Sequence, residues 1–141
     1  MDRADAVPPV VIAVDPGRDK CGLAAVSATG EVLHQSVPAV GEIAEAVARL
    51  LEQHSGAVVV LGGRTGARDV GAALSAACGL RPIPVDEHHS TLEGRRRYFR
   101  DNPPRGWRCL LPVGLQTPPR PYDDYVAIIL AERYLKSLDR G

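Results

Sequence analysis

The chain has 141 residues, of which 45% are hydrophobic and 24% are charged, which is an ordinary composition for a globular domain. It holds 17 basic and 17 acidic residues, so its formal net charge is zero and overall charge gives no support for nucleic-acid binding. We therefore expect one domain, residues 1–141, in which any binding to a polyanion depends on a local patch.

The cysteines and the N-terminal residues predict the cellular setting. Cys21, Cys78 and Cys109 are odd in number and far apart, which fits neither a disulfide framework nor a zinc site. Residues 1–9 lack the apolar core of a signal peptide and are expected to form a flexible N-terminal segment. No stretch of the sequence is long and apolar enough to span a bilayer. We expect a cytoplasmic protein with reduced thiols and no membrane contact.

The first part of the chain predicts an antiparallel meander. Residues 10–14 are apolar and mainly β-branched, and they run into Asp15 and a Pro-Gly break, as expected of a buried strand. Further strands are predicted over 21–26 and 31–37, with a tight turn at Thr29-Gly30. Asp15 therefore lies where a central strand leaves the sheet.

The remaining chain alternates helices and strands. A repeat of apolar residues three and four apart and an Ala-rich segment predict helices, and two short apolar runs predict strands parallel to the first. The second of these strands holds two prolines, which favours an edge position. The helices are expected at 41–54, at 67–78, from Ser90 onward and at 122–138, and the strands at 57–61 and 82–85.

Three connections carry further signals. The Gly-rich turn after residue 61 lacks the spacing and the lysine of a P-loop, but it places Arg64 and Thr65 at a strand end. Ser90 and Glu93 have the spacing of a capping box. Residues 101–121 hold six prolines and are expected to form a long proline-rich loop.

Acidic residues occur at three places that the predicted topology brings together. Asp15 and the pair Asp86-Glu87 each follow a strand, and Asp123 and Asp124 open the last helix. Ligands gather beyond the carboxyl ends of strands in α/β sheets, and clustered carboxylates need a cation to offset their repulsion. Oxygen ligands favour Mg²⁺ or Mn²⁺, and two such ions can catalyse phosphoryl displacement. The alternatives are a solvated turn at 86–87 and helix-capping acids at 123–124.

Arginines are concentrated around the helix that starts near Ser90. Positive side chains there would bind phosphate, and Tyr98, Phe99 or Trp107 would stack on unpaired bases. The alternative is a solvated helix face with Tyr98 and Phe99 in the core. With the strand-end residues, the candidate nucleic-acid-binding residues are Arg18, Lys20, Arg64, Thr65, Arg95, Arg96, Arg97 and Arg100.

Three motifs resemble those of the RNase H-like superfamily, in its RuvC and YqgF branch. They are the Asp-Pro-Gly-Arg-Asp-Lys-Cys-Gly stretch of 15–22, the Asp86-Glu87 segment followed by Ser-Thr-Leu-Glu at 90–93, and the acidic helix start within 121–130. The resemblance implies an α/β RNase H-like fold: a mixed five-stranded sheet, with an antiparallel 1-2-3 meander plus parallel strands and helices on both faces.

The same resemblance implies a two-metal-ion nuclease that is often a homodimer. Asp15, Glu87 and Asp124 would be the metal-binding and catalytic acids, with Mg²⁺ or Mn²⁺, and Asp123 is the alternative to Asp124. The YqgF-like motifs favour RNA, with pre-16S ribosomal RNA maturation as the associated role. Cleavage of Holliday-junction DNA, the RuvC role, is the alternative.

Two readings compete with a nuclease. One is a non-catalytic nucleic-acid-binding module in which the acids only cap helices and turns. The other is a phosphotransferase related to sugar kinases and actin, whose two-domain cleft needs a longer chain than 141 residues.

Overall fold

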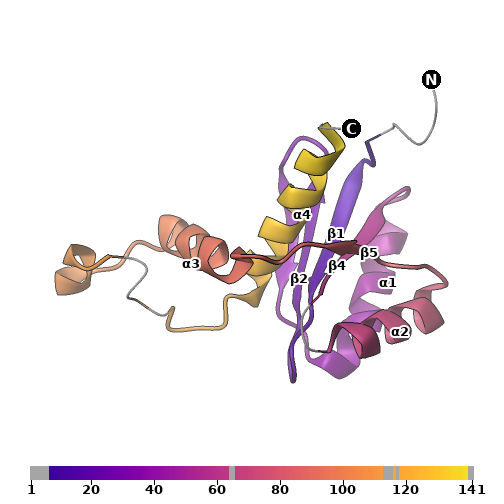
Figure 1. The fold of residues 1–141 in the computed structure, drawn as a ribbon, viewed down its shortest axis with the longest axis horizontal. Helices are drawn as coiled ribbons and strands as arrows, with labels where there is room; N and C mark the ends of the chain where they lie inside the picture. The colour runs from indigo at the N-terminus through magenta and orange to yellow at the C-terminus, as the bar shows by residue number, and fades with distance from the viewer. Residues whose placement is uncertain (1–6, 64–65, 113–115, 117, 140–141) are drawn as a thin grey trace.

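A five-stranded sheet with helices on both faces forms the protein, as the sequence predicts (Figure 1). The computed structural model describes residues 7–63, 66–112, 116 and 118–139. The strand order is β3-β2-β1-β4-β5, with β1 antiparallel to β2 and parallel to β4. The strands are β1 (Val10–Asp15), β2 (Gly22–Ser27), β3 (Val32–Ser36), β4 (Val58–Gly62) and β5 (Ile83–Val85). The helices are α1 (Ile43–Gln53), α2 (Ala67–Cys78), α3 (Ser90–Asp101) and α4 (Asp123–Asp139), with short 3-10 helices η2 (Val40–Glu42) and η3 (Gly106–Leu110).

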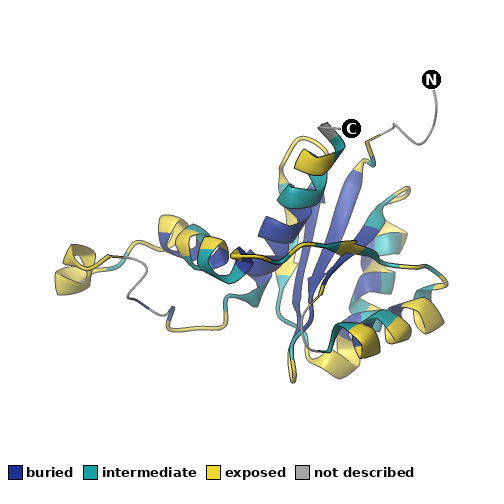
Figure 2. Cartoon of the chain, in the orientation of Figure 1, coloured by how far each residue is buried: buried dark blue, intermediate teal, exposed yellow. Residues whose placement is uncertain are grey.

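The central strand β1 is buried on both sides, so each of its faces contributes to a separate apolar core (Figure 2). Val10, Ile12 and Val14 pack with α1 and α2. Val11 and Ala13 pack on the other side with α4 and with aromatic residues of α3. Because side chains alternate along a strand, Asp15 belongs to the face that α4 covers.

Helix α4 lies against the sheet across β1 and β2, and α3 packs on its outer side. The run from Tyr125 to Ala131 is buried. Gly94 of α3 allows this packing, since a Cβ there would come within 3.0 Å of the backbone nitrogen of Val126. The result is that the start of α4 is held above the end of the sheet where β1 terminates.

The structure corrects several local expectations. The predicted capping box is wrong: His89, with a φ of 60°, is the N-cap of α3, Ser90 is buried, and the Glu93 carboxylate pairs with Arg133 at 3.1 Å. The predicted helix over 41–54 is divided into η2 and α1. The proline-rich loop contains η3, which hydrophobic periodicity did not reveal.

Other local signals are confirmed. Helix α2 ends at Gly79, whose φ of 65° and bond to the carbonyl of Ser75 make it the expected stop. The two-proline strand β5 lies at the sheet edge. None of the helices in the described part of the chain has the length and apolarity needed to cross a bilayer.

A candidate acidic site at the end of the central strand

Two glycines flank Asp15 in the sheet. Gly22 of β2 is its antiparallel partner, and Gly62 of β4 falls beside it when the parallel register of Val14 with Leu61 is continued by one residue. Asp15 is only 3% exposed. Neighbouring strands lie about 5 Å apart, so two positions without side chains leave space on each side of the buried carboxylate.

Glu87 fills the space above Gly62. A Cβ on Gly62 would overlap Oε1 of Glu87 and lie 2.6 Å from its Cδ. The Glu87 carboxylate thus rests on the backbone of β4, one strand away from Asp15. The structure brings these two predicted acids together at the same edge of the sheet.

The turn between β5 and α3 holds Glu87 in this place. The Asp86 carboxylate accepts a 3.0 Å bond from the backbone N–H of His88, which is the turn role considered as the alternative for this pair. The Glu87 carbonyl accepts a bond from the N–H of Ser90. Arg133 of α4 donates to the Asp86 carbonyl at 2.9 Å. Asp86 therefore shapes the turn, whereas Glu87 faces the sheet.

Asp123 approaches Asp15 from the opposite side, above Gly22. A Cβ on Gly22 would overlap the main-chain carbonyl of Asp123 and lie 3.1 Å from its Cβ. The start of α4 therefore touches the backbone of β2 directly, one strand away from Asp15. Across β4, β1 and β2, the acidic side chains follow the order Glu87, Asp15, Asp123.

Asp124 is turned toward the edge strand β3. Its Oδ2 accepts a 2.8 Å bond from the side-chain amide of Gln35, and its Oδ1 lies 3.5 Å from Arg120. Arg120 in turn lies over the rings of Tyr98 and Tyr125, 5.1 and 5.5 Å from their centroids. Asp124 is 4% exposed, so its charge is buried with two partners.

Cys21, directly before Gly22, is a further ionisable group near these acids. Burial raises the pKa of its thiol; a hydrogen bond with the backbone of Gly17 opposes the rise, and the charges of Asp15 and Asp123 add to it. The thiol is fully buried. It therefore stays protonated at neutral pH and does not behave as a thiolate ligand.

The donor set at this edge suits a hard divalent cation, because it consists of carboxylate oxygens. In the arrangement seen, the described residues include no group of three or more His, Cys, Asp or Glu side chains close enough to hold a metal ion. Glu87 lies over the strand next to the one that carries Asp15. At the start of α4, the backbone and Cβ of Asp123 lie over Gly22, whereas the Asp124 carboxylate is engaged by Gln35 and Arg120.

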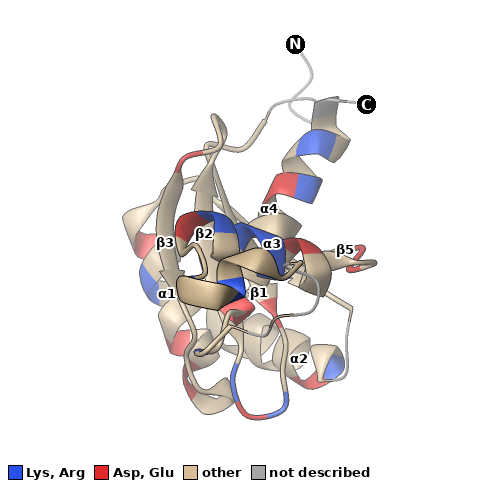
Figure 3. Cartoon of the chain, turned by 90° about the vertical axis from the view of Figure 1, so that its left-hand side faces the viewer, with Lys and Arg blue, Asp and Glu red and all other residues tan. Residues whose placement is uncertain are grey.

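The basic candidates fall into two groups. Arg95 donates to the Tyr122 hydroxyl at 3.3 Å, and Arg97 makes two bonds of 2.9 and 2.8 Å to the carboxylate of Glu132, so both help to pack α3 on α4. The exposed residues are Arg18 and Lys20 in the loop after β1 and Arg96 and Arg100 on α3. Figure 3 shows where Lys and Arg, in blue, and Asp and Glu, in red, occur along the ribbon. Arg64 and Thr65 lie outside the described residues.

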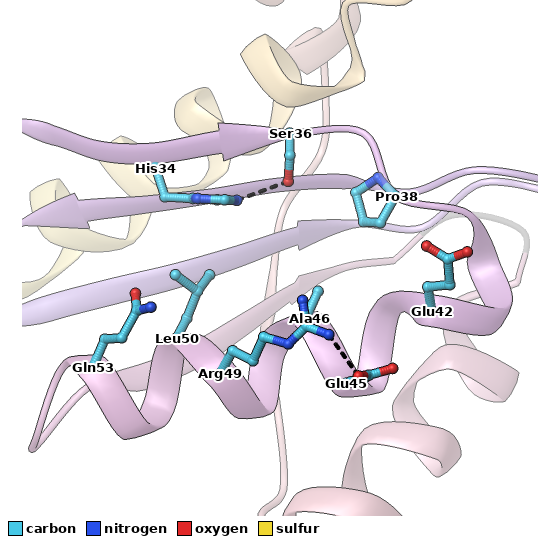
Figure 4. A pocket seen from close by; sticks show the side chains of 9 residues that line it. All are labelled: His34, Ser36, Pro38, Glu42, Glu45, Ala46, Arg49, Leu50 and Gln53. Carbon is cyan, nitrogen blue, oxygen red and sulfur yellow. Dashed lines mark hydrogen bonds and ion pairs between the residues drawn. The ribbon is translucent and has the colours of Figure 1, made fainter.

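A pocket of about 350 Å³ lies between β3 and α1 (Figure 4). It is lined in part by His34, Glu42 and Arg49, the last of which pairs with Glu45 at 2.6 Å. Since α1 covers the sheet face opposite α4, this pocket is separate from the acidic site.

Several residues that shape the site were not recognised from sequence. They are Gly22, Gly62, Gln35, Arg120 and Arg133. The two glycines carried a usable signal, because Gly22 begins and Gly62 ends a strand next to the strand that carries Asp15. The other three act through contacts between segments distant in sequence, which no local pattern reveals.

Gly62→Ala tests whether the Glu87 position depends on this glycine. The new methyl group would displace the end of a flexible side chain, so we expect the free energy of unfolding to fall by only about 1 kcal/mol, the typical cost of a point substitution. Any activity that uses Glu87 should fall by about 100-fold, since a displacement of about 1 Å has effects of that size. Gly63→Ala is the matched control, because its Cβ would meet no atom within 4 Å. Equal activity of the two variants would refute the role given to Gly62.

Comparison with known proteins supports the fold through structure alone. No family model matches the sequence, and no curated protein matches it. Thermus thermophilus RuvC in complex with a Holliday junction substrate is similar, with a TM-score of 0.63, 20% identity, and coverage of 94% of this chain and 96% of that chain. A second Thermus thermophilus RuvC structure gives a TM-score of 0.58 at 18% identity, covering 92% and 96%. The chain therefore has the RNase H-like fold of RuvC, as its three motifs predicted.

Proposed function

We propose that the protein is a metal-dependent nuclease that hydrolyses phosphodiester bonds of nucleic acid. The observation that supports this most strongly is the convergence of Glu87, Asp15 and Asp123 over three adjacent strands, with a glycine on each side of Asp15. Acids that merely cap helices or turns need no such space beside a buried carboxylate. The RuvC-like fold adds independent support.

In this proposal Asp15 and Glu87 hold Mg²⁺ or Mn²⁺, and the start of α4 supplies the third carboxylate. Asp123 lies beside Asp15, whereas Asp124 joins once its bonds to Gln35 and Arg120 are exchanged. The bound ions, two in the RuvC and YqgF pattern, supply Lewis-acid activation of water and of the scissile phosphate.

The chain itself provides position and electrostatics. Burial of Asp15 and the fixed turn at 86–90 keep the carboxylates oriented before substrate binds, which lowers the reorganisation needed for reaction. Exposed Arg18 and Lys20 follow directly after Asp15 in the loop, where they would attract the phosphate backbone. Exposed cations beside a cluster of acids suit a polyanionic substrate whose binding is completed by divalent cations.

Different observations favour two different substrate classes. The sequence motifs resemble YqgF, which favours processing of RNA of the pre-16S ribosomal type. The backbone resembles that of a RuvC solved with a Holliday junction, which favours branched DNA. Junction resolution further requires a two-fold homodimer that presents two sites to a symmetric substrate.

A cleavage assay with three substrates tests the proposal: a single-stranded RNA, a mobile four-way DNA junction and a linear duplex, each with Mn²⁺, Mg²⁺ or EDTA. We expect metal-dependent cleavage that EDTA abolishes. Symmetric paired nicks in the junction by a protein of dimer mass would assign the resolvase role, and shortening of the RNA would assign processing. Salt-sensitive binding of these nucleic acids without cleavage in any metal would contradict the nuclease proposal and indicate a non-catalytic binding module.

A further inference from the structure

The zero net charge hides a strong division of charge along the chain. Residues 94–122 contain seven arginines and one acidic residue, a formal charge of +6, so the rest of the chain carries −6. This segment leaves the acidic site and returns to it, because it begins shortly after Glu87 and ends just before Asp123. Figure 1 shows α3 and η3, drawn in orange, extending to one side of the sheet.

Not all of these arginines are equally available. Arg95, Arg97 and Arg120 contact Tyr122, Glu132 and Asp124 respectively, and so join α3 and the loop to α4. By contrast, Arg96, Arg100, Arg105 and Arg108 are exposed. The nearest acid to Arg100 is exposed Asp101 at 3.9 Å, a pair that water screens strongly.

Large apolar side chains are exposed beside these charges. Trp107 is 68% exposed and Leu110 is 82% exposed, both on η3. The guanidinium of Arg108 lies over the indole, 6.0 Å from its centroid. An exposed indole with cations around it has the composition of a base-stacking site, since bases stack on aromatic faces and phosphates bind arginine.

The segment also has defined internal structure. The side-chain amide of Gln116, which is buried, donates to the carbonyls of Arg108 and Leu111 at 2.9 and 3.1 Å, and so closes the loop around η3. A groove of about 730 Å³ separates this loop from the end of α3, with Arg105 and Arg108 among its lining residues. The exposed cations and the indole are therefore held on one ordered projection.

We propose that residues 95–112, here called the arm, form a binding surface for unpaired nucleic acid, on which Trp107 stacks against a base while Arg96, Arg100, Arg105 and Arg108 contact phosphates. This inference rests on the proposed nuclease function and names the part of the substrate that the arm recognises. Because the segment that contains the arm connects Glu87 to Asp123 along the chain and α3 packs on α4, a strand bound along the arm is led toward Asp15. A second copy of this chain is the competing occupant, and charge argues against it, since two arms of like charge repel.

Trp107 is the only tryptophan of the chain, so its emission reports on the arm alone. The experiment titrates the full chain, in EDTA to prevent turnover, with oligothymidylate of about 12 nucleotides, a length within the usual site size of single-strand binders. The same titration uses a blunt linear duplex. We expect the oligothymidylate to quench the emission, and the fully paired duplex to leave it unchanged.

Variants separate stacking from charge. In anisotropy with labelled oligothymidylate, Trp107→Ala should weaken binding about 10-fold and Trp107→Phe less. Arg105→Ala and Arg108→Ala should each lower the slope of log K against log salt by about 0.7, as expected for one lost phosphate contact to a single strand. Arg49→Ala is the control, because Arg49 is exposed on α1 and pairs only at the surface.

The outcomes distinguish this inference from the proposed function. If oligothymidylate leaves the emission unchanged and Trp107→Ala binds it as tightly as the native chain, the proposed role of the arm is overturned, even when metal-dependent cleavage is observed. The Trp107 emission could instead shift with protein concentration while the mass doubles before any oligonucleotide is added. That result would show that the arm forms a contact between two copies of the chain, and it would also overturn the proposed binding of nucleic acid. Quenching without cleavage in any metal would support the arm and contradict the nuclease.

Discussion

Asp15→Asn should lower metal-dependent cleavage by about 100- to 1000-fold, because loss of a single charge-stabilising group at an active site has effects of that size. The amide keeps the shape of the carboxylate but loses the charge that binds a cation. Asp15 is 3% exposed, with the Glu87 carboxylate above one flanking strand and the backbone and Cβ of Asp123 above the other. Without metal, the variant should be at least as stable as the native chain, since one of several like charges is removed.

Thermal unfolding with and without Mn²⁺ supplies a readout that does not depend on turnover. A ligand at 100 times its Kd stabilises the folded state by about 2.7 kcal/mol, so the native chain should gain stability from Mn²⁺ and the variant should not. Asp19→Asn is the matched control, since Asp19 is exposed in the loop that follows β1. An Asp15→Asn variant that cleaves as fast as the native chain would remove the basis for the nuclease proposal.

Gly22→Ala should have the largest effect on stability, a loss of about 3 kcal/mol and a Tm lower by roughly 10 °C. A Cβ at Gly22 would overlap the main-chain carbonyl of Asp123. Unlike the flexible end of Glu87 above Gly62, this neighbour is the backbone of α4, the helix that covers β1 and β2. The helix start must therefore shift as a body or detach from the sheet.

Chemical denaturation, followed by circular dichroism, measures this effect. Gly41→Ala provides the comparison, because a Cβ at Gly41 would meet no atom within 4 Å and its free energy of unfolding should hardly change. If Gly22→Ala and Gly41→Ala unfold at the same denaturant concentration, the close approach of α4 to β2 is not a requirement of the fold. Activity of Gly22→Ala should also fall, since the shift carries Asp123 away from Asp15.

The contrast between the two glycine variants follows from what each one supports. Gly62 makes room for a side chain, so its replacement affects the site and leaves the fold intact. Gly22 makes room for a helix, so its replacement affects both. Both lie in the same cross-strand row as Asp15, which links the packing of α4 to the geometry of the acids.

The sequence alone determined the order of the strands and helices, because the buried face of each element leaves a periodic pattern of apolar residues in the sequence. It also identified Asp15 and Glu87 as strand-end acids. The prediction that failed depended on a weak local signal. The spacing of Ser90 and Glu93 matches a capping box, but Glu93 pairs with Arg133 of α4 and His89 is the N-cap.

Only the tertiary structure decided how the acids are arranged. The pair Asp86-Glu87 reads as two equivalent carboxylates in sequence, yet one bonds its own turn and the other lies over Gly62. Asp123 and Asp124 are likewise adjacent, but the helix turns one toward β2 and the other toward Gln35 of β3. Sequence patterns fix which residue types stand at an element end, whereas the direction of each side chain depends on contacts between segments far apart in the chain.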